Sequence, residues 1–150
     1  MRDFHADTRI ERAAAGEAEF ELISSLLLNG DGIDDVGAII RPEYFVNEQL
    51  RDIYRVLQRL RREDRPTTTE AVAAEMGSKE GIIETLQNSV ELLPHGLHAE
   101  YFARRVKASW QRRSFGYLMN DTQAELARPD RSPDEVLNHH ARHVEQLLDD

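Results

Sequence analysis

The histidines of "HHARH", at 139–143, are the side chains whose type and spacing most directly suggest chemistry. His139 and His143 stand one helical turn apart, so their imidazoles could hold a metal ion from one face of a helix. No cysteine or acidic residue accompanies them in a ligand pattern, and histidines on a terminal helix usually face solvent. We therefore expect no metal site here.

Other catalytic patterns are absent from the sequence. There is no cysteine, which excludes thiol catalysis, disulfides and cysteine-bound zinc. No GxxxxGK[ST] segment is present, so this chain has no P-loop ATPase site. The paired acids at 34–35 and 149–150 suit a helix start and a charged tail better than a catalytic pair. We expect no catalytic residue and no cofactor.

The charge of the chain is strongly uneven. The net charge is −9, yet 51–65 carries six basic and three acidic residues, and 100–113 carries five basic and one acidic residue. The rest of the chain therefore carries −16. Such acidity opposes phosphate, so we expect direct nucleic-acid binding to be weak or absent.

The first basic stretch lies on a predicted helix over about 47–63. At 100° per residue its apolar residues share one side and its arginines the other. A solvated back face and a docking stripe for a partner are both consistent with this pattern. The apolar side consists of Leu50, Ile53, Tyr54, Val56, Leu57 and Leu60, and the other side of Arg51, Arg55, Arg59 and Arg62.

Helical periodicity recurs along the chain, and no alternation is long enough to predict a strand. The fold class is therefore all-α, with a compact globule over 17–94 after a flexible arm at 1–16. A long antiparallel helical hairpin follows over 97–150, with helices near 97–127 and 133–148. The apolar segment at 22–28 is too short to cross a membrane, and the first residues lack the pattern of a signal peptide. These features indicate a cytoplasmic protein.

Capping signals mark several of the helix starts. Thr67 with Glu70 three residues later forms a capping box, as does Ser132 with Glu135. Ser78 is expected to cap a further short helix.

Four segments occur in one order along the chain: "EAEFELISSLLLN", "IIRPEYFVNEQLRDIYRVLQRL", "PTTTEAVAAEM" and "EYFARRVKASWQRR". The second segment contains two motifs, "RPEYF" and Ile53-Tyr54, so the segments carry five motifs in all. In this order they resemble the N-terminal domain of DnaB-type replicative helicases over about 16–150. The matching positions are Glu17, Ala18, Glu19, Pro42, Glu43, Phe45, Ile53, Tyr54, Val72, Ala73, Glu75, Tyr101, Ala103, Arg104 and Val106.

The resemblance implies that the globule has six helices. It also implies a non-catalytic module whose motor domain would follow the end of this chain. In the family the domain forms an N-terminal collar, pairs through its hairpins into dimers within a hexameric ring, and docks primase or a helicase loader. The hairpin residues that would mediate self-association are Trp110, Phe115, Leu118, Val136, Leu137 and Val144. The arginines that would dock a protein partner are Arg51, Arg55, Arg59, Arg62, Arg104, Arg105, Arg112 and Arg113.

Three hypotheses remain open from the sequence. In the first, the chain is the interaction domain of a replicative helicase. In the second, it is a freestanding phage or mobile-element relative that regulates the host helicase. The third is a single-stranded DNA-binding accessory protein, because Tyr101, Phe102 and Trp110 lie near the second basic stretch and could stack on bases.

Overall fold

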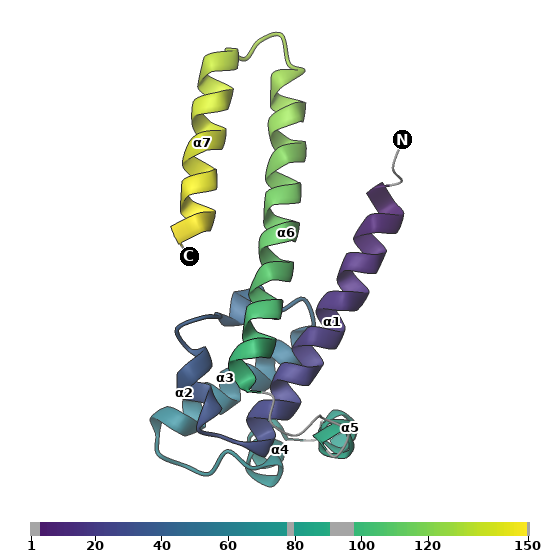
Figure 1. Cartoon of the computed structure of the whole chain (residues 1–150), viewed down its shortest axis with the longest axis vertical. Coiled ribbons are helices and arrows are strands. Elements are labelled where there is room, and N and C mark those ends of the chain that lie inside the picture. Colours follow the sequence, from purple (N-terminus) through teal and green to yellow (C-terminus); the bar gives the residue numbers. More distant parts are fainter. Residues whose placement is uncertain (1–3, 78–79, 91–97, 150) are drawn as a thin grey trace. The chain divides into compact units, whose positions relative to one another are not determined.

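A computed structural model of the chain describes residues 4–77, 80–90 and 98–149. Within these ranges every regular element is a helix, which confirms the all-α prediction (Figure 1). Five α-helices and one 3-10 helix precede a long helix and its antiparallel partner. The elements are α1 (Phe4–Leu28), α2 (Gly32–Val36), η1 (Pro42–Tyr44), α3 (Glu48–Arg62), α4 (Thr69–Met76), α5 (Glu80–Val90), α6 (Ala99–Leu126) and α7 (Pro133–Asp149).

The chain divides into two compact units, Met1–Ala108 and Ser109–Asp150. The division falls later than the 94–97 boundary that the sequence indicated, so α6 begins in the first unit and ends in the second. The second unit consists of the end of α6 and α7, joined by a short turn (Figure 1).

α3 organises the first unit, because it contacts α1, α2, α4 and η1. Its predicted apolar side is buried as expected, with Leu50, Ile53 and Leu57 at most 3% exposed. The Tyr54 ring is also buried and stacks on Phe45, with 5.2 Å between ring centroids. This burial fixes which side of α3 carries the arginines.

The helix starts agree with the sequence in part. Asn47 caps α3, and its side chain accepts a hydrogen bond from the Leu50 N–H at 3.0 Å. The cap of α4 is Thr68 and not Thr67, since the Thr68 hydroxyl accepts from the Ala71 N–H at 3.2 Å. α7 begins at Pro133 directly after Ser132, as expected. The predicted cap Ser78 lies outside the described residues.

α1 differs most from the prediction. We expected a loose arm as far as residue 16 and a helix from Glu17, but the helical backbone already begins at Phe4. The segment at 9–19, "RIERAAAGEAE", is rich in Ala, Arg and Glu, which favour helix without producing an apolar period.

Candidate interaction surfaces

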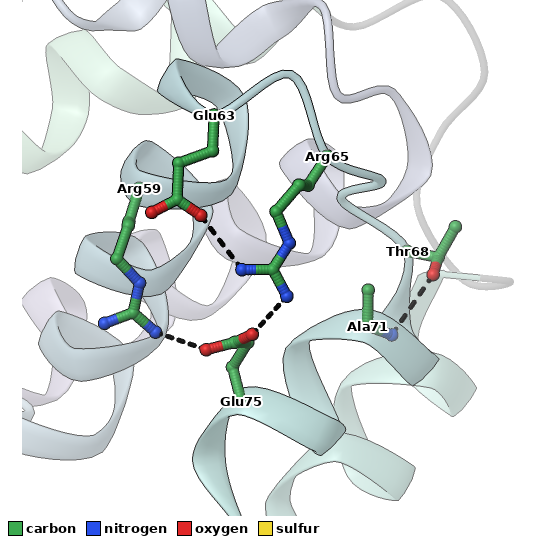
Figure 2. A network of polar contacts seen from close by, with 6 residues as sticks. All are labelled: Arg59, Glu63, Arg65, Thr68, Ala71 and Glu75. Atoms are coloured by element: carbon green, nitrogen blue, oxygen red, sulfur yellow. Dashed lines mark hydrogen bonds and ion pairs between the residues drawn. The ribbon is translucent and has the colours of Figure 1, made fainter.

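Two arginines near the end of α3 converge on one carboxylate of α4 (Figure 2). Arg59 pairs with one oxygen of Glu75 at 2.6 Å, and Arg65 bonds to the other Glu75 oxygen. Arg65 also bonds to Glu63, at 2.9 Å. The hydrogen bond from Arg65 is the main reason that the pKa of Glu75 lies below its ordinary value. This network ties α4 to α3.

A second ion pair ties α3 to α2. Arg61 donates from Nε and Nη2 to one carboxylate oxygen of Asp34, at 3.0 and 2.8 Å, and Nη2 lies 3.4 Å from Asp31. The hydrogen bond from Arg61 lowers the pKa of Asp34. Neither Arg61 nor Arg65 was predicted from the sequence to have a role, although the acidic residues at 31–35 are a possible signal for such a pair.

The remaining α3 arginines differ in how free they are. Arg51 is half-buried and donates to the Phe45 carbonyl at 2.7 Å. Arg55 lies 3.7 Å from Asp52, one turn earlier on the same helix. Arg62 is exposed and makes no hydrogen bond or ion pair with the residues that the structure describes. Most of the predicted docking stripe therefore has partners inside the first unit.

The second basic stretch begins on the part of α6 that belongs to the first unit. Arg105 pairs with Glu21 at 2.7 Å, and its guanidinium carbon lies 5.9 Å from the centre of the Tyr101 ring. Arg104 is exposed and unpaired among the described residues. Phe102 is only 3% exposed, so it cannot stack on a base as the DNA hypothesis required.

In the second unit, the predicted self-association residues fall into three classes of exposure. Val136 is 3% exposed and belongs to the core of the hairpin. Leu137 is 51% exposed and remains available to a partner. The half-buried members are Trp110, Phe115, Leu118 and Val144. Two of the predicted docking arginines also lie in this unit. Arg112 is exposed, whereas Arg113 is half-buried and has a partner.

The spacing of apolar residues gives this hairpin one apolar face. On α6, residues at 115, 119 and 126 fall within about 40° of one another at 100° per residue, and on α7 so do those at 137, 144 and 148. Both rows are rotated in the same sense, by about 40–60°, from the Thr122–His140 contact that joins the two helices, so in an antiparallel pair they lie on the same side of the hairpin. We call this set the apolar face: Phe115, Met119, Leu126, Leu137, Val144 and Leu148. Sequence reasoning missed Met119, Leu126 and Leu148, although all three are exposed and follow the same spacing.

The other side of the hairpin is polar. Asp121 and Glu125 of α6 and His139 and His143 of α7 line a cavity of about 500 Å³. The two imidazole rings lie edge to face, 4.2 Å apart. Among the described residues, no three histidine, aspartate or glutamate side chains are placed to hold a metal ion.

A side-chain bond joins the two helices between these faces. The Thr122 hydroxyl donates to the Leu118 carbonyl at 2.8 Å and lies 2.6 Å from Nδ1 of His140. The bond fixes the register of α7 along α6.

Most of the chain matches a known protein family. Residues 12–108 match the family described as DnaB-like helicase N terminal domain. The chain belongs to this family. The match ends at Ala108, which is also the last residue of the first unit.

The fold of this DnaB-like N-terminal domain is also similar to a solved structure. The N-terminal domain of DnaB helicase from Mycobacterium tuberculosis has a TM-score of 0.71 and 22% sequence identity. The similarity covers 86% of this chain and 94% of that one, which is more than the first unit alone can supply. A search of curated protein sequences finds no match. Within the part of the chain described here, no helix has the length and apolar character needed to cross a bilayer.

Proposed function

We propose that this domain is the non-catalytic interaction and oligomerisation module of a DnaB-type replicative helicase. The observation that carries the proposal is the apolar face of the hairpin. Met119, Leu137 and Leu148 are each more than half exposed there, at 64, 51 and 61%. Several large apolar side chains gathered on one exposed face usually mark a surface that a partner covers.

A second copy of the chain is the proposed occupant of this face. Two identical hairpins related by a two-fold axis bury the same patch on both subunits and form a closed dimer. Such dimers, arranged in a ring with the motor domain, would form an N-terminal collar. The membership of the chain in the DnaB-like family supports this arrangement.

We further propose that the collar docks primase or a helicase loader through the first unit. Arg62 and Arg104 are exposed and have no partner among the described residues, so they can pair with an acidic protein surface. The net charge of −9 favours a protein over DNA as that partner.

Sedimentation velocity on the isolated chain tests the proposal. We expect a dimer whose proportion rises with protein concentration, and a shift to monomer when Met119 and Leu137 are both replaced by glutamate. A strict monomer at high concentration would remove the apolar face as the basis of self-association. Docking is tested separately by the binding of purified primase or loader to wild type and to Arg62→Glu/Arg104→Glu.

A further inference from the structure

A groove on the first unit has no role in the hairpin contacts described above. It lies where α1, α3 and α5 meet and has a volume of about 570 Å³. Each helix supplies one apolar wall: Phe20 of α1, Leu50 of α3 and Ile82 of α5. Leu50 is buried, whereas Phe20 and Ile82 remain half-exposed to the groove.

Two glycines leave the groove open. Gly16 of α1 and Gly81 of α5 both line it, and a Cβ atom added to either would meet no atom within 4 Å. Gly16 is inside α1, where glycine costs about 1 kcal/mol relative to alanine, and Gly81 is the second residue of α5. A larger side chain at Gly81 would therefore fit the fold and partly fill the groove.

Two of the polar side chains that line the groove, Asn47 and Thr85, already make hydrogen bonds within their own elements. The Asn47 carbonyl oxygen accepts from the Leu50 N–H at 3.0 Å, and the Thr85 hydroxyl donates to the Gly81 carbonyl at 2.9 Å. An apolar group can therefore enter without breaking these two hydrogen bonds.

Among the residues that the structure describes, most of the charges beside the groove are negative. Glu17 lines it, and Glu48 and Glu84 are exposed directly beside the lining residues Asn47 and Thr85. The nearest cation on α3, Arg51, is half-buried and directs Nη2 to the Phe45 carbonyl. The described flanks are thus mainly acidic around an apolar centre, with Arg51 as the exception.

We propose that this groove docks a helical segment of a partner protein, one that presents an apolar side chain flanked by lysines or arginines. An amphipathic helix laid into a groove is a recurring mode of recognition. The apolar residue would fill the space beside Gly16 and Gly81, and the basic residues would face Glu17 and Glu84. The inference rests on the proposed partner-docking role and gives it a surface separate from the hairpin.

Two synthetic amphipathic helices of equal length test the proposal. Both carry the same leucine stripe, flanked by lysines in one peptide and by glutamates in the other. Each is titrated into the ¹⁵N-labelled full chain. We expect the lysine peptide to shift the amide signals of Gly16, Phe20, Gly81 and Thr85, and the glutamate peptide to leave them unchanged.

Matched variants separate groove binding from general attraction to an acidic protein. Gly81→Leu should weaken binding of the lysine peptide at least tenfold. Gly116→Leu, a control at a helical glycine that also has open space around it, should leave that binding unchanged. Glu17→Lys/Glu84→Lys should weaken it similarly, with Glu145→Lys as the control. Equal binding of both peptides, or undiminished binding to Gly81→Leu, would overturn the proposal. Sedimentation of the same samples distinguishes this proposal from the proposed self-association, because variants that abolish peptide binding to the groove should leave the dimer intact.

Discussion

The Glu19 carboxylate on α1 accepts a hydrogen bond from the backbone N–H of Asn47, 28 residues later, at 3.3 Å. The same oxygen also accepts from the Val46 N–H. Glu19 is only 1% exposed. A buried carboxylate thus satisfies two backbone donors at the start of α3, where Asn47 provides the cap.

This bond gives a physical reason for two of the sequence motifs to occur together. Glu19 belongs to the "EAE" segment, and Phe45 belongs to the "RPEYF" segment directly before the bonded amides. The first segment supplies the acceptor and the second presents the donors. Neither segment can hold the entrance to α3 in this way without the other.

Replacing Glu19 by alanine should therefore destabilise the first unit by about 2–4 kcal/mol, because two backbone donors lose their acceptor and a small cavity is left. Glu19→Gln keeps an oxygen acceptor and should cost less. Urea unfolding measures both changes, with the exposed neighbour Glu17→Gln as the control, expected within about 0.5 kcal/mol. Equal losses for Glu19→Ala and Glu17→Gln would contradict this role.

The fold could be predicted well where the sequence itself repeats. The apolar side of α3 follows from residues three and four apart, and Asn47 stands alone as a capping residue before that pattern. The cap of α4 could not be chosen in the same way, because Thr67, Thr68 and Thr69 are all capable of it. In the structure Thr68 has the extended backbone of a cap, and its side chain accepts from the Ala71 N–H.

The candidate surfaces were harder to predict than the fold. The spacing of the α3 arginines placed them correctly on one side, but their partners are distant in the sequence. Glu75 is 16 residues after Arg59, and Asp34 is 27 residues before Arg61. Such contacts depend on how the helices pack, and periodicity carries no information about that.

A second prediction concerns Gly30 and Thr67, which belong to different loops of the first unit. A Cβ atom at Gly30 would lie 2.1 Å from the Thr67 hydroxyl oxygen, far inside van der Waals contact. Gly30→Ala should lower the stability by about 1–3 kcal/mol. Thr67→Ala removes that oxygen, so the double variant should recover most of the loss. A thermal unfolding cycle of the four proteins measures the coupling, and additive losses would show that the loops do not touch in this way.

A third prediction follows from the lowered pKa values of Asp34 and Glu75. A carboxylate whose pKa is lower in the folded state stabilises the fold above its unfolded pKa, about 4 for both residues. That contribution is lost as the pH falls through the lower, folded value. Asp34→Asn/Glu75→Gln should therefore lose less stability than wild type between pH 6 and pH 3. Thermal melting across this range tests it, and salt should reduce the difference because both pairs are exposed.

A fourth prediction concerns alkaline pH. Burial raises the pKa of Tyr54 to about 12. The unfolded chain then loses this proton from about pH 10, while the folded protein keeps it, so stability falls as the pH rises between the two values. Tyr54→Phe should be close to wild type at pH 7 and should lose about 2 kcal/mol less between pH 9 and pH 12. Parallel losses in the two proteins would show that Tyr54 ionises freely in the fold.

The last prediction separates the two sides of the hairpin. Met119→Glu/Leu137→Glu places charges on the apolar face, whereas His139→Glu/Asp121→Asn changes the polar side. If the apolar face joins two copies, the first pair should weaken the dimer at least tenfold, since each charge would be buried without a partner. The second pair should leave the dimer nearly unchanged.

Circular dichroism shows whether these variants lose the dimer alone or also lose the helical structure of the hairpin. Met119 and Leu137 are both more than half exposed within the hairpin, at 64 and 51%, so their replacement should not reduce helicity. Val136→Glu is the contrasting control: Val136 is 3% exposed, and a charge there should open the hairpin itself. A loss of helicity in Met119→Glu/Leu137→Glu comparable to that in Val136→Glu would mean that these residues hold the hairpin together. Retained helicity with a weakened dimer would assign them to the contact between two copies.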